Sequence, residues 1–126
     1  MLDHCSLGVR DLDRAQRFYG AALAPLGYRC LRALPDELAF GSDDAWAFWL
    51  YPVAAPEPIV GARAHVALAA PSPAAVEGFA AAVGALGATI VRPPGLRPDI
   101  SPRYFGTVVR DLDGHTIEVV HWSAAS

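Results

Sequence analysis

Two histidines and one glutamate carry the clearest chemical signal in this sequence. His4 and His65 each open an apolar stretch, and Glu118 lies inside a third such stretch near the C-terminus. Two imidazoles and one carboxylate leave coordination positions open on a divalent metal, a set that is typical of Fe(II). Open positions allow a bound water or a substrate oxygen to be activated. The sequence therefore predicts one divalent metal ion on these three residues, with iron, manganese, zinc and nickel all chemically possible.

The alternation of side chains supports a common location for the three residues. Successive side chains in a β-strand point to opposite faces. In the stretches beginning at His4 and His65, the histidine falls opposite the larger apolar residues, and Glu118 falls opposite Ile117 and Val119. The apolar faces must pack on helices, so all three side chains are expected on the other face. A single histidine or glutamate in a strand is more often a hydrogen-bonded residue than a ligand, so the prediction depends on the three together.

The elements that must position these residues form two similar halves. An offset near 61 residues aligns His4 with His65 and Phe18 with Phe79. Each half is expected to contain one strand, one helix and three further strands, which is a βαβββ module. The expected modules cover about residues 1–55 and 62–123 of a single domain, 1–126. The predicted fold class is α+β.

Capping residues indicate where the two helices begin and end. The first is expected to begin after Asp11 and to reach Leu26 before Gly27 closes it in the left-handed conformation. The second has Ser72 as its N-cap, Pro73 at its first position and Gly87 as its stop. Both helices should cover the apolar faces of the strands.

Turn-forming residues divide the remaining strands. The expected strands are 28–33, 38–41, 45–51, 88–91, 103–110 and 115–122. Asp113 and Gly114 predict a tight two-residue hairpin turn. Proline-rich stretches at 52–58 and 93–102 predict the link between the halves and a long loop. Arg-Asp-Leu-Asp occurs at 10–13 and again at 110–113, and we interpret this repetition as turn chemistry and not as a site.

Composition excludes several functional classes. The 126 residues include 10 arginines, no lysine and 13 acidic residues, with a net charge of −3 and 53% hydrophobic side chains. The scattered arginines form no basic face for nucleic acid. The longest uncharged stretch, 78–91, contains three glycines and is shorter than the roughly 20 apolar residues of a membrane-spanning helix. No signal peptide is visible at the N-terminus, so a cytoplasmic protein is expected. Cys5 falls on the helix-facing side, as a core residue and not a nucleophile.

The residues 111–118, Asp-Leu-Asp-Gly-His-Thr-Ile-Glu, carry the most specific family likeness, together with the stretches that open at His4 and His65. Over almost its whole length the chain resembles the vicinal oxygen chelate superfamily, which includes glyoxalase I, bleomycin-resistance proteins, fosfomycin-resistance enzymes and extradiol dioxygenases. The resemblance implies mixed sheets that form a partly closed barrel around a central cavity. It also implies that His4, His65 and Glu118 occupy three of the four ligand positions.

The fourth ligand position departs from glyoxalase I. Trp49 stands where that enzyme carries an acidic ligand that also shuttles protons. The remaining His-His-Glu set is similar to that of extradiol dioxygenases and fosfomycin-resistance transferases. The sequence shows no counterpart of the dioxygenases' auxiliary acid-base histidine and tyrosine, and it has no lysine for a phosphonate.

Five further residues are predicted to contact the substrate. Trp49 and Tyr51 share one face of the strand 45–51 and suit a flat or apolar substrate. In the expected long loop, Arg97 and Arg103 can bind a carboxylate, and Tyr104 can act as a hydrogen-bonding acid. A core role for Trp49 and a surface role for the loop residues are the alternatives.

The leading functional hypothesis is a metal-dependent enzyme acting on a small oxygen-chelating substrate, aromatic or not, as a lyase or isomerase, a dioxygenase or a thiol transferase. The alternative is a metal-free binding protein for small molecules such as drugs, of the bleomycin-resistance type, using Trp49 and Tyr51. A third hypothesis is a vestigial site on an interaction module. A homodimer is expected, whose barrels close within each chain or by exchange of modules.

Overall fold

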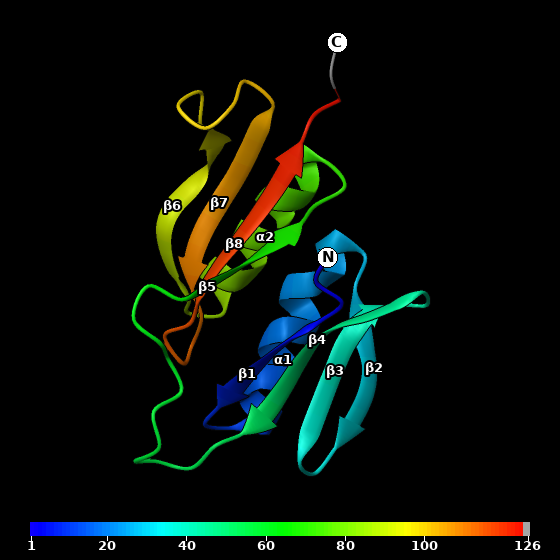
Figure 1. Ribbon diagram of the computed structural model, residues 1–126, viewed down its shortest axis with the longest axis vertical. Coiled ribbons are helices and arrows are strands. Elements are labelled where there is room, and N and C mark those ends of the chain that lie inside the picture. The colour runs from blue at the N-terminus through cyan, green and yellow to red at the C-terminus, as the bar shows by residue number, and fades with distance from the viewer. Residues whose placement is uncertain (125–126) are drawn as a thin grey trace.

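The computed structural model describes residues 1–124 as two βαβββ units (Figure 1). The predicted α+β fold of two such modules is confirmed. The first unit consists of β1 (Cys5–Val9), α1 (Leu12–Leu23), the short 3₁₀ helix η1 (Ala24–Leu26), β2 (Arg29–Leu34), β3 (Glu37–Ser42) and β4 (Ala45–Pro52). The second consists of β5 (His65–Ala69), α2 (Pro73–Ala85), β6 (Thr89–Leu96), β7 (Tyr104–Arg110) and β8 (Thr116–Trp122).

Each unit builds one four-stranded mixed sheet. The strand orders are β1-β4-β3-β2 and β5-β8-β7-β6. The first strand of each unit runs parallel to the last one, and the other pairs are antiparallel. Among residues 1–124 no strand pairing joins the two sheets, so the arrangement is only partly closed. Because β5 is next to β8, a residue at the start of the second unit lies beside one near its end.

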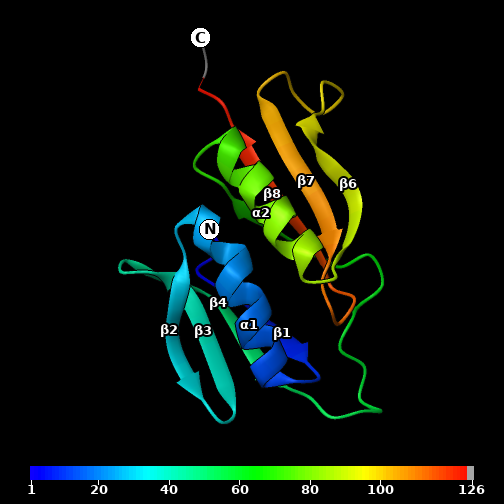
Figure 2. The same ribbon diagram turned by 180° about the vertical axis from the view of Figure 1, so that it is seen from behind.

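The helices cover one face of the two sheets and leave the other face open. Both helices lie behind the sheets in Figure 1 and in front of them in Figure 2. One apolar cluster spans the two units, and its largest members include Tyr19, Phe40, Phe48 and Phe79. Cys5 packs against this cluster, as predicted. No helix in the described part of the chain is long and apolar enough to cross a membrane.

The predicted helix caps are confirmed, and the end of the first helix is corrected. Asp11 Oδ1 accepts from the amide of Arg14 at 3.0 Å, and Ser72 Oγ accepts from the amide of Ala75 at 3.1 Å. Gly27 and Gly87 adopt φ angles of 86° and 94°. The helix was predicted to reach Leu26, but α1 ends at Leu23 and tightens into η1. Pro25 has no N–H to continue the α-helical hydrogen bonding.

The long loop predicted at 93–102 begins later than predicted. β6 continues through Pro93 and Pro94 to Leu96, so the loop is shorter, at residues 97–103. β6 is the edge strand of its sheet, and its pairing with β7 shifts register on both sides of Arg92. An edge strand with irregular register tolerates prolines because their missing N–H groups face no partner strand.

The hairpin between β7 and β8 is also corrected. It was predicted as a two-residue turn, but three residues connect Asp111 to His115, whose backbone groups pair at 2.9 Å. The amide of Gly114 donates to the carbonyl of Asp111 at 3.1 Å, and Gly114 has a φ of 90°. Asp113 keeps a negative φ, as in a type I turn followed by a left-handed glycine.

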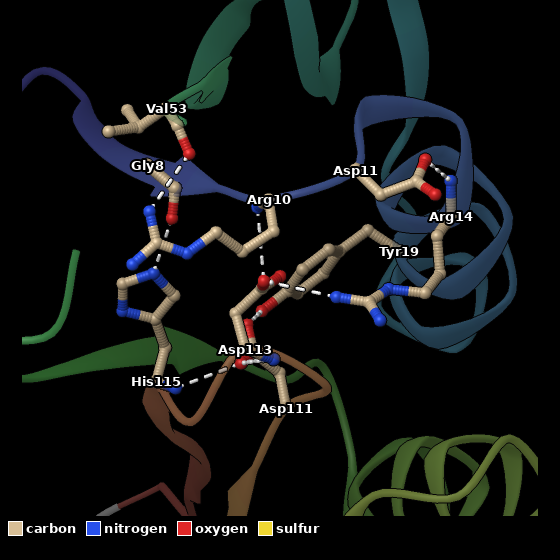
Figure 3. A network of polar contacts seen from close by, with 9 residues as sticks. All are labelled: Gly8, Arg10, Asp11, Arg14, Tyr19, Val53, Asp111, Asp113 and His115. Carbon is tan, nitrogen blue, oxygen red and sulfur yellow. Dashed lines mark hydrogen bonds and ion pairs between the residues drawn. The ribbon is translucent and has the colours of Figure 1, made fainter. Parts of the chain in front are cut away.

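The two Arg-Asp-Leu-Asp segments meet at the junction between the units (Figure 3). Their turn chemistry is confirmed, since Asp11 caps α1 and Asp111 Oδ1 accepts from two amides of its own hairpin. They also contact each other, because Asp113 Oδ1 accepts from the amide of Arg10 and from Arg14 Nη2, each at 3.1 Å. Identical local sequences thus form a polar clamp between the units.

Tyr19 and His115 complete this clamp. The hydroxyl of Tyr19, on α1, donates to Asp111 Oδ2, and His115 Nε2 lies 2.7 Å from the carbonyl oxygen of Gly8 on β1. Tyr19, Asp111 and His115 are all buried. The clamp therefore fixes how the sheet of the second unit stands against the first helix and strand.

The buried hydroxyl of Tyr19 predicts a loss of stability at alkaline pH. Burial, together with the charge and hydrogen bond of Asp111, raises the pKa of Tyr19 well above its usual value. Above about pH 10 the unfolded chain releases this proton while the folded chain keeps it, so the free energy of unfolding falls as pH rises. Guanidinium unfolding at pH 8 and pH 11 should show a smaller fall for Tyr19→Phe than for the wild type. Equal falls would contradict this assignment.

Candidate functional site

His65 and Glu118 come together on the open face of the second sheet. The parallel register of β5 and β8 pairs Ala67 with Glu118, and His65 lies two residues earlier on the same face. The His65 Nε2 and Glu118 Oε1 atoms are 3.5 Å apart. The His65 side chain is 52% exposed and that of Glu118 is 20% exposed. The strand alternation predicted the face on which both side chains lie, and the pairing of β5 with β8 brings them together.

His4 lies on the other unit, immediately before β1. Its Nδ1 atom is 2.7 Å from Asp3 Oδ1, and its ring is 6.3 Å from that of Trp49. His4 and His65 line the same hollow of about 620 Å³ between the units. Among residues 1–124, however, no three histidine, cysteine, aspartate or glutamate side chains form a group that could hold a metal. Of the three predicted metal ligands, His65 and Glu118 therefore lie together within one chain, and His4 lies apart from them.

Tyr104 holds the carboxylate of Glu118. Its hydroxyl donates to Glu118 Oε2 at 3.0 Å, which leaves Oε1 on the side of His65. Burial and the hydrogen bond to Glu118 raise the pKa of Tyr104 to about 12. The hydroxyl is therefore protonated at neutral pH. The sequence indicated Tyr104 as a hydrogen-bonding acid, and the structure gives its partner.

Gly106 makes room for this tyrosine, which the sequence reasoning missed. A Cβ atom at Gly106 would lie 2.5 Å from the Tyr104 hydroxyl oxygen. Tyr104, Gly106 and Val108 alternate onto one face of β7, and Val108 pairs with Glu118. A tyrosine can reach a glutamate along this row only if the residue between them has no side chain. The spacing of Tyr104, Gly106 and Glu118 across a hairpin was the available signal.

The first sheet presents an aromatic surface on its open face. Trp49 and Tyr51 pair with Ser6 and Gly8, and so lie on the face that His4 shares. Strand alternation counted from Trp49 would place Trp46 on the helix side, but Trp46 is 40% exposed and its ring lies 5.8 Å from that of Trp49. The pairing of β3 with β4 shifts register next to Phe48, and this irregularity turns Trp46 outward.

Arg97 and Arg103 already have partners. Arg97 makes two contacts to the Asp99 carboxylate, at 2.8 and 2.5 Å. Arg103 Nε donates to the carbonyl oxygen of Ser123 at 2.6 Å. Either arginine would have to release its partner before it could bind a substrate carboxylate in full.

A family model described as Glyoxalase/Bleomycin resistance protein/Dioxygenase superfamily matches residues 1–119. The chain belongs to this superfamily. No protein with a curated description matches the chain.

Solved structures of the glyoxalase superfamily have the same fold as this chain. A glyoxalase/bleomycin resistance protein from Albidiferax ferrireducens T118 is 30% identical and aligns with a TM-score of 0.85 over 98% of this chain and 99% of its own. The fosfomycin resistance protein FosX from Mesorhizobium loti is 25% identical, with a TM-score of 0.68 over 98% and 92%. FosX from Listeria monocytogenes is 20% identical, with a TM-score of 0.70 over 98% and 93%.

The donor atoms on the second sheet of this glyoxalase-superfamily chain fit a divalent metal. Imidazole and carboxylate bonds to zinc are about 2.0–2.2 Å long, so two ligand atoms of one ion lie roughly 3–3.5 Å apart. The 3.5 Å separation of His65 Nε2 and Glu118 Oε1 is close to this value. A carboxylate held by a second residue, as Tyr104 holds Glu118, is also usual around metal ligands.

Proposed function

We propose that the protein is a metal-dependent enzyme that acts on a small substrate with two neighbouring oxygen atoms. His65 and Glu118 of one copy and His4 of a second copy hold one divalent ion, which is iron, manganese, zinc or nickel. The observation that carries the proposal is the 3.5 Å His65–Glu118 pair on an open sheet face. When bound, such an ion supplies open coordination positions that polarise substrate oxygens and stabilise negative charge.

The exposure of the open faces supports a homodimer with shared sites. His4 and His65 side chains are 53% and 52% exposed. Trp46 on the first sheet and Trp122 on the second are 40% and 49% exposed. Exposed apolar surface of this kind marks an interaction site, and a two-fold axis can place the first sheet of one copy opposite the second sheet of the other. Such a dimer brings His4 to the His65–Glu118 pair and covers the aromatic surface.

The remaining residues of the proposed site orient the metal ligand and bind the substrate. Glu118 offers Oε1 as a ligand atom while Tyr104 fixes its Oε2. Tyr104 serves as a positioning residue, because its hydroxyl donates to the ligand Glu118. Trp49 and Tyr51 provide apolar walls for the substrate, and an indole has no group that accepts a proton. Trp49 therefore cannot act as the base that glyoxalase I has at this position, which disfavours an isomerisation of the glyoxalase I type. We favour a dioxygenase or a transferase.

A complementation experiment tests the shared site. We expect His4→Ala and His65→Ala dimers each to lose bound metal, as measured by elemental analysis after purification in excess metal. A heterodimer of the two variants, isolated through two different tags, keeps one intact site out of two and should hold about half of the wild-type metal. His121→Gln, on the opposite face of β8, is the matched control and should retain metal.

Three outcomes would contradict the proposal. Full metal content in His65→Ala would exclude the ligand pair. A metal-free heterodimer would exclude a contribution of His4 across the dimer. A wild type that takes up no metal but binds an aromatic ligand, with quenched tryptophan fluorescence unaffected by chelator, would favour the metal-free binding protein instead.

A further inference from the structure

Arg92 lies in the same row of the second sheet as the proposed metal ligand Glu118. It pairs with Val108 on β7, and Val108 pairs with Glu118 on β8. Directly paired residues of antiparallel strands point to the same face. Two strand spacings of about 4.8 Å place the backbones of Arg92 and Glu118 roughly 10 Å apart. A small molecule can therefore reach from one side chain to the other.

The backbone of Arg92 is fixed although it lies on an edge strand. The Thr107 hydroxyl, which is buried, donates to the carbonyl oxygen of Arg92 at 2.7 Å. Register shifts occur on both sides of Arg92 in the pairing of β6 with β7. Such irregularities re-aim side chains and are frequent beside functional sites.

The guanidinium of Arg92 has no partner in the described part of the chain. Its Nη1 atom is buried and makes no hydrogen bond, and no ion pair involves Arg92 within residues 1–124. Four other arginines, at positions 14, 29, 32 and 97, do form ion pairs. A buried nitrogen of a charged group in a protein normally has an acceptor, because leaving it without one costs free energy. A buried guanidinium nitrogen without an acceptor therefore points to an anion that the site receives.

We propose that Arg92 binds an oxyanion of the substrate, a carboxylate, phosphate or phosphonate group, while another part of the same molecule occupies the His65–Glu118 pair. This inference rests on the proposed function and names the substrate class for that site. A guanidinium offers two parallel N–H groups to such an anion, which fixes the orientation as well as the charge of the ligand. Arg97 and Arg103, the arginines indicated by the sequence, already bind Asp99 and Ser123. Arg92 differs from both in having a buried guanidinium nitrogen with no acceptor among residues 1–124.

Anion titration of metal-free protein tests the subsite separately from the metal. Chelator-treated wild type is titrated with inorganic phosphate and, separately, with acetate, in a calorimeter at constant ionic strength. We expect binding of at least one of the two anions, and at least tenfold weaker binding for Arg92→Gln. The matched control is Arg110→Gln, because Arg110 is an exposed arginine on the same strand face, two residues from Val108. It should bind within about twofold of the wild type.

The titration shows which anionic group the site prefers and whether Arg92 binds it. Preference for phosphate indicates a tetrahedral group on the substrate, and preference for acetate indicates a planar carboxylate. Equal affinity in wild type and Arg92→Gln, or no binding of either anion by the wild type, overturns the proposal. A loss confined to Arg110→Gln also overturns it, because the anion then sits in the hollow of about 420 Å³ beside Arg63 and Arg110.

Thermal unfolding gives a second readout. Because no residue among 1–124 pairs with the Arg92 guanidinium, Arg92→Gln should leave the melting temperature unchanged or raise it by a few degrees. A fall of more than about 5 °C would assign Arg92 a structural role and overturn the proposal. The proposed function is tested by a different measurement, the metal content of the heterodimer, so the two proposals can fail independently. If the protein takes up no metal but binds an anion through Arg92, the anion subsite is supported and the metal-dependent activity is contradicted.

Discussion

Asp111→Ala is expected to lower the free energy of unfolding by about 3–5 kcal/mol. The Asp111 side chain is buried and accepts from the Tyr19 hydroxyl and from the amides of Asp113 and His115, the last two at 2.9 Å. Alanine leaves all three donors without an acceptor, and each buried unsatisfied donor costs about 1–3 kcal/mol. It also removes the hydrogen bond between Tyr19 on α1 and this carboxylate, so the junction between the units loosens.

Chemical unfolding of three variants checks this result. Tyr19→Phe removes one donor together with its hydrogen bond, so it should cost about 1–2 kcal/mol. Asp13→Ala, at an exposed position in the first turn of α1, should cost less than about 1 kcal/mol. A loss below about 1 kcal/mol for Asp111→Ala would show that water satisfies the junction and that the clamp does not hold the units.

Local chemistry made much of the fold predictable. Asp11, Ser72, Gly27 and Gly87 act within their own segments, and their roles as caps were predicted from neighbouring residues alone. The shared face of His65 and Glu118 followed from strand alternation, while their proximity comes from the parallel pairing of β5 with β8. The sequence was sufficient for these caps, whereas the short Asp113-Gly114 motif predicted the wrong turn length.

Irregular and long-range features were not predictable in the same way. Strand alternation assumes an unbroken register, and the shifts near Phe48 and Arg92 turned Trp46 outward and extended β6 through two prolines. The meeting of residues 10–14 with Asp113 depends on how two units dock, which no local pattern encodes. The same holds for the position of His4 relative to His65 and Glu118, which depends on how the units pack.

Gly106→Ala is expected to damage both the stability and the proposed metal site. A Cβ atom there would lie 2.5 Å from the Tyr104 hydroxyl oxygen and 2.8 Å from the carbonyl oxygen of Val119. The carbonyl belongs to β8, which pairs with β7, so it cannot withdraw without disturbing the sheet. Tyr104 is confined by Trp122, whose ring lies 5.6 Å away, edge to face. We expect a loss of about 2–4 kcal/mol in the free energy of unfolding.

The effect on metal binding follows from the loss of the bond between Tyr104 and Glu118. Removing a residue that orients a metal ligand typically weakens metal affinity by about 10–100-fold. Isothermal titration with zinc and guanidinium unfolding measure the two effects on the same samples. The matched control is Gly95→Ala, because Gly95 pairs with Gly106 across β6 and β7 but has no atom closer than 3.9 Å to a Cβ. It should keep both stability and metal affinity near the wild-type values.

A double variant separates the two consequences of the methyl group. Tyr104→Phe alone removes the hydrogen bond to Glu118 and should weaken zinc binding while costing about 1 kcal/mol of stability. If the methyl group acts on the metal site through Tyr104, Gly106→Ala adds no further loss of affinity in the Tyr104→Phe background. Its cost in stability persists there, because the contact with the Val119 carbonyl oxygen does not involve the tyrosine hydroxyl. Wild-type affinity in Gly106→Ala, despite lowered stability, would mean that Glu118 needs no tyrosine to hold it.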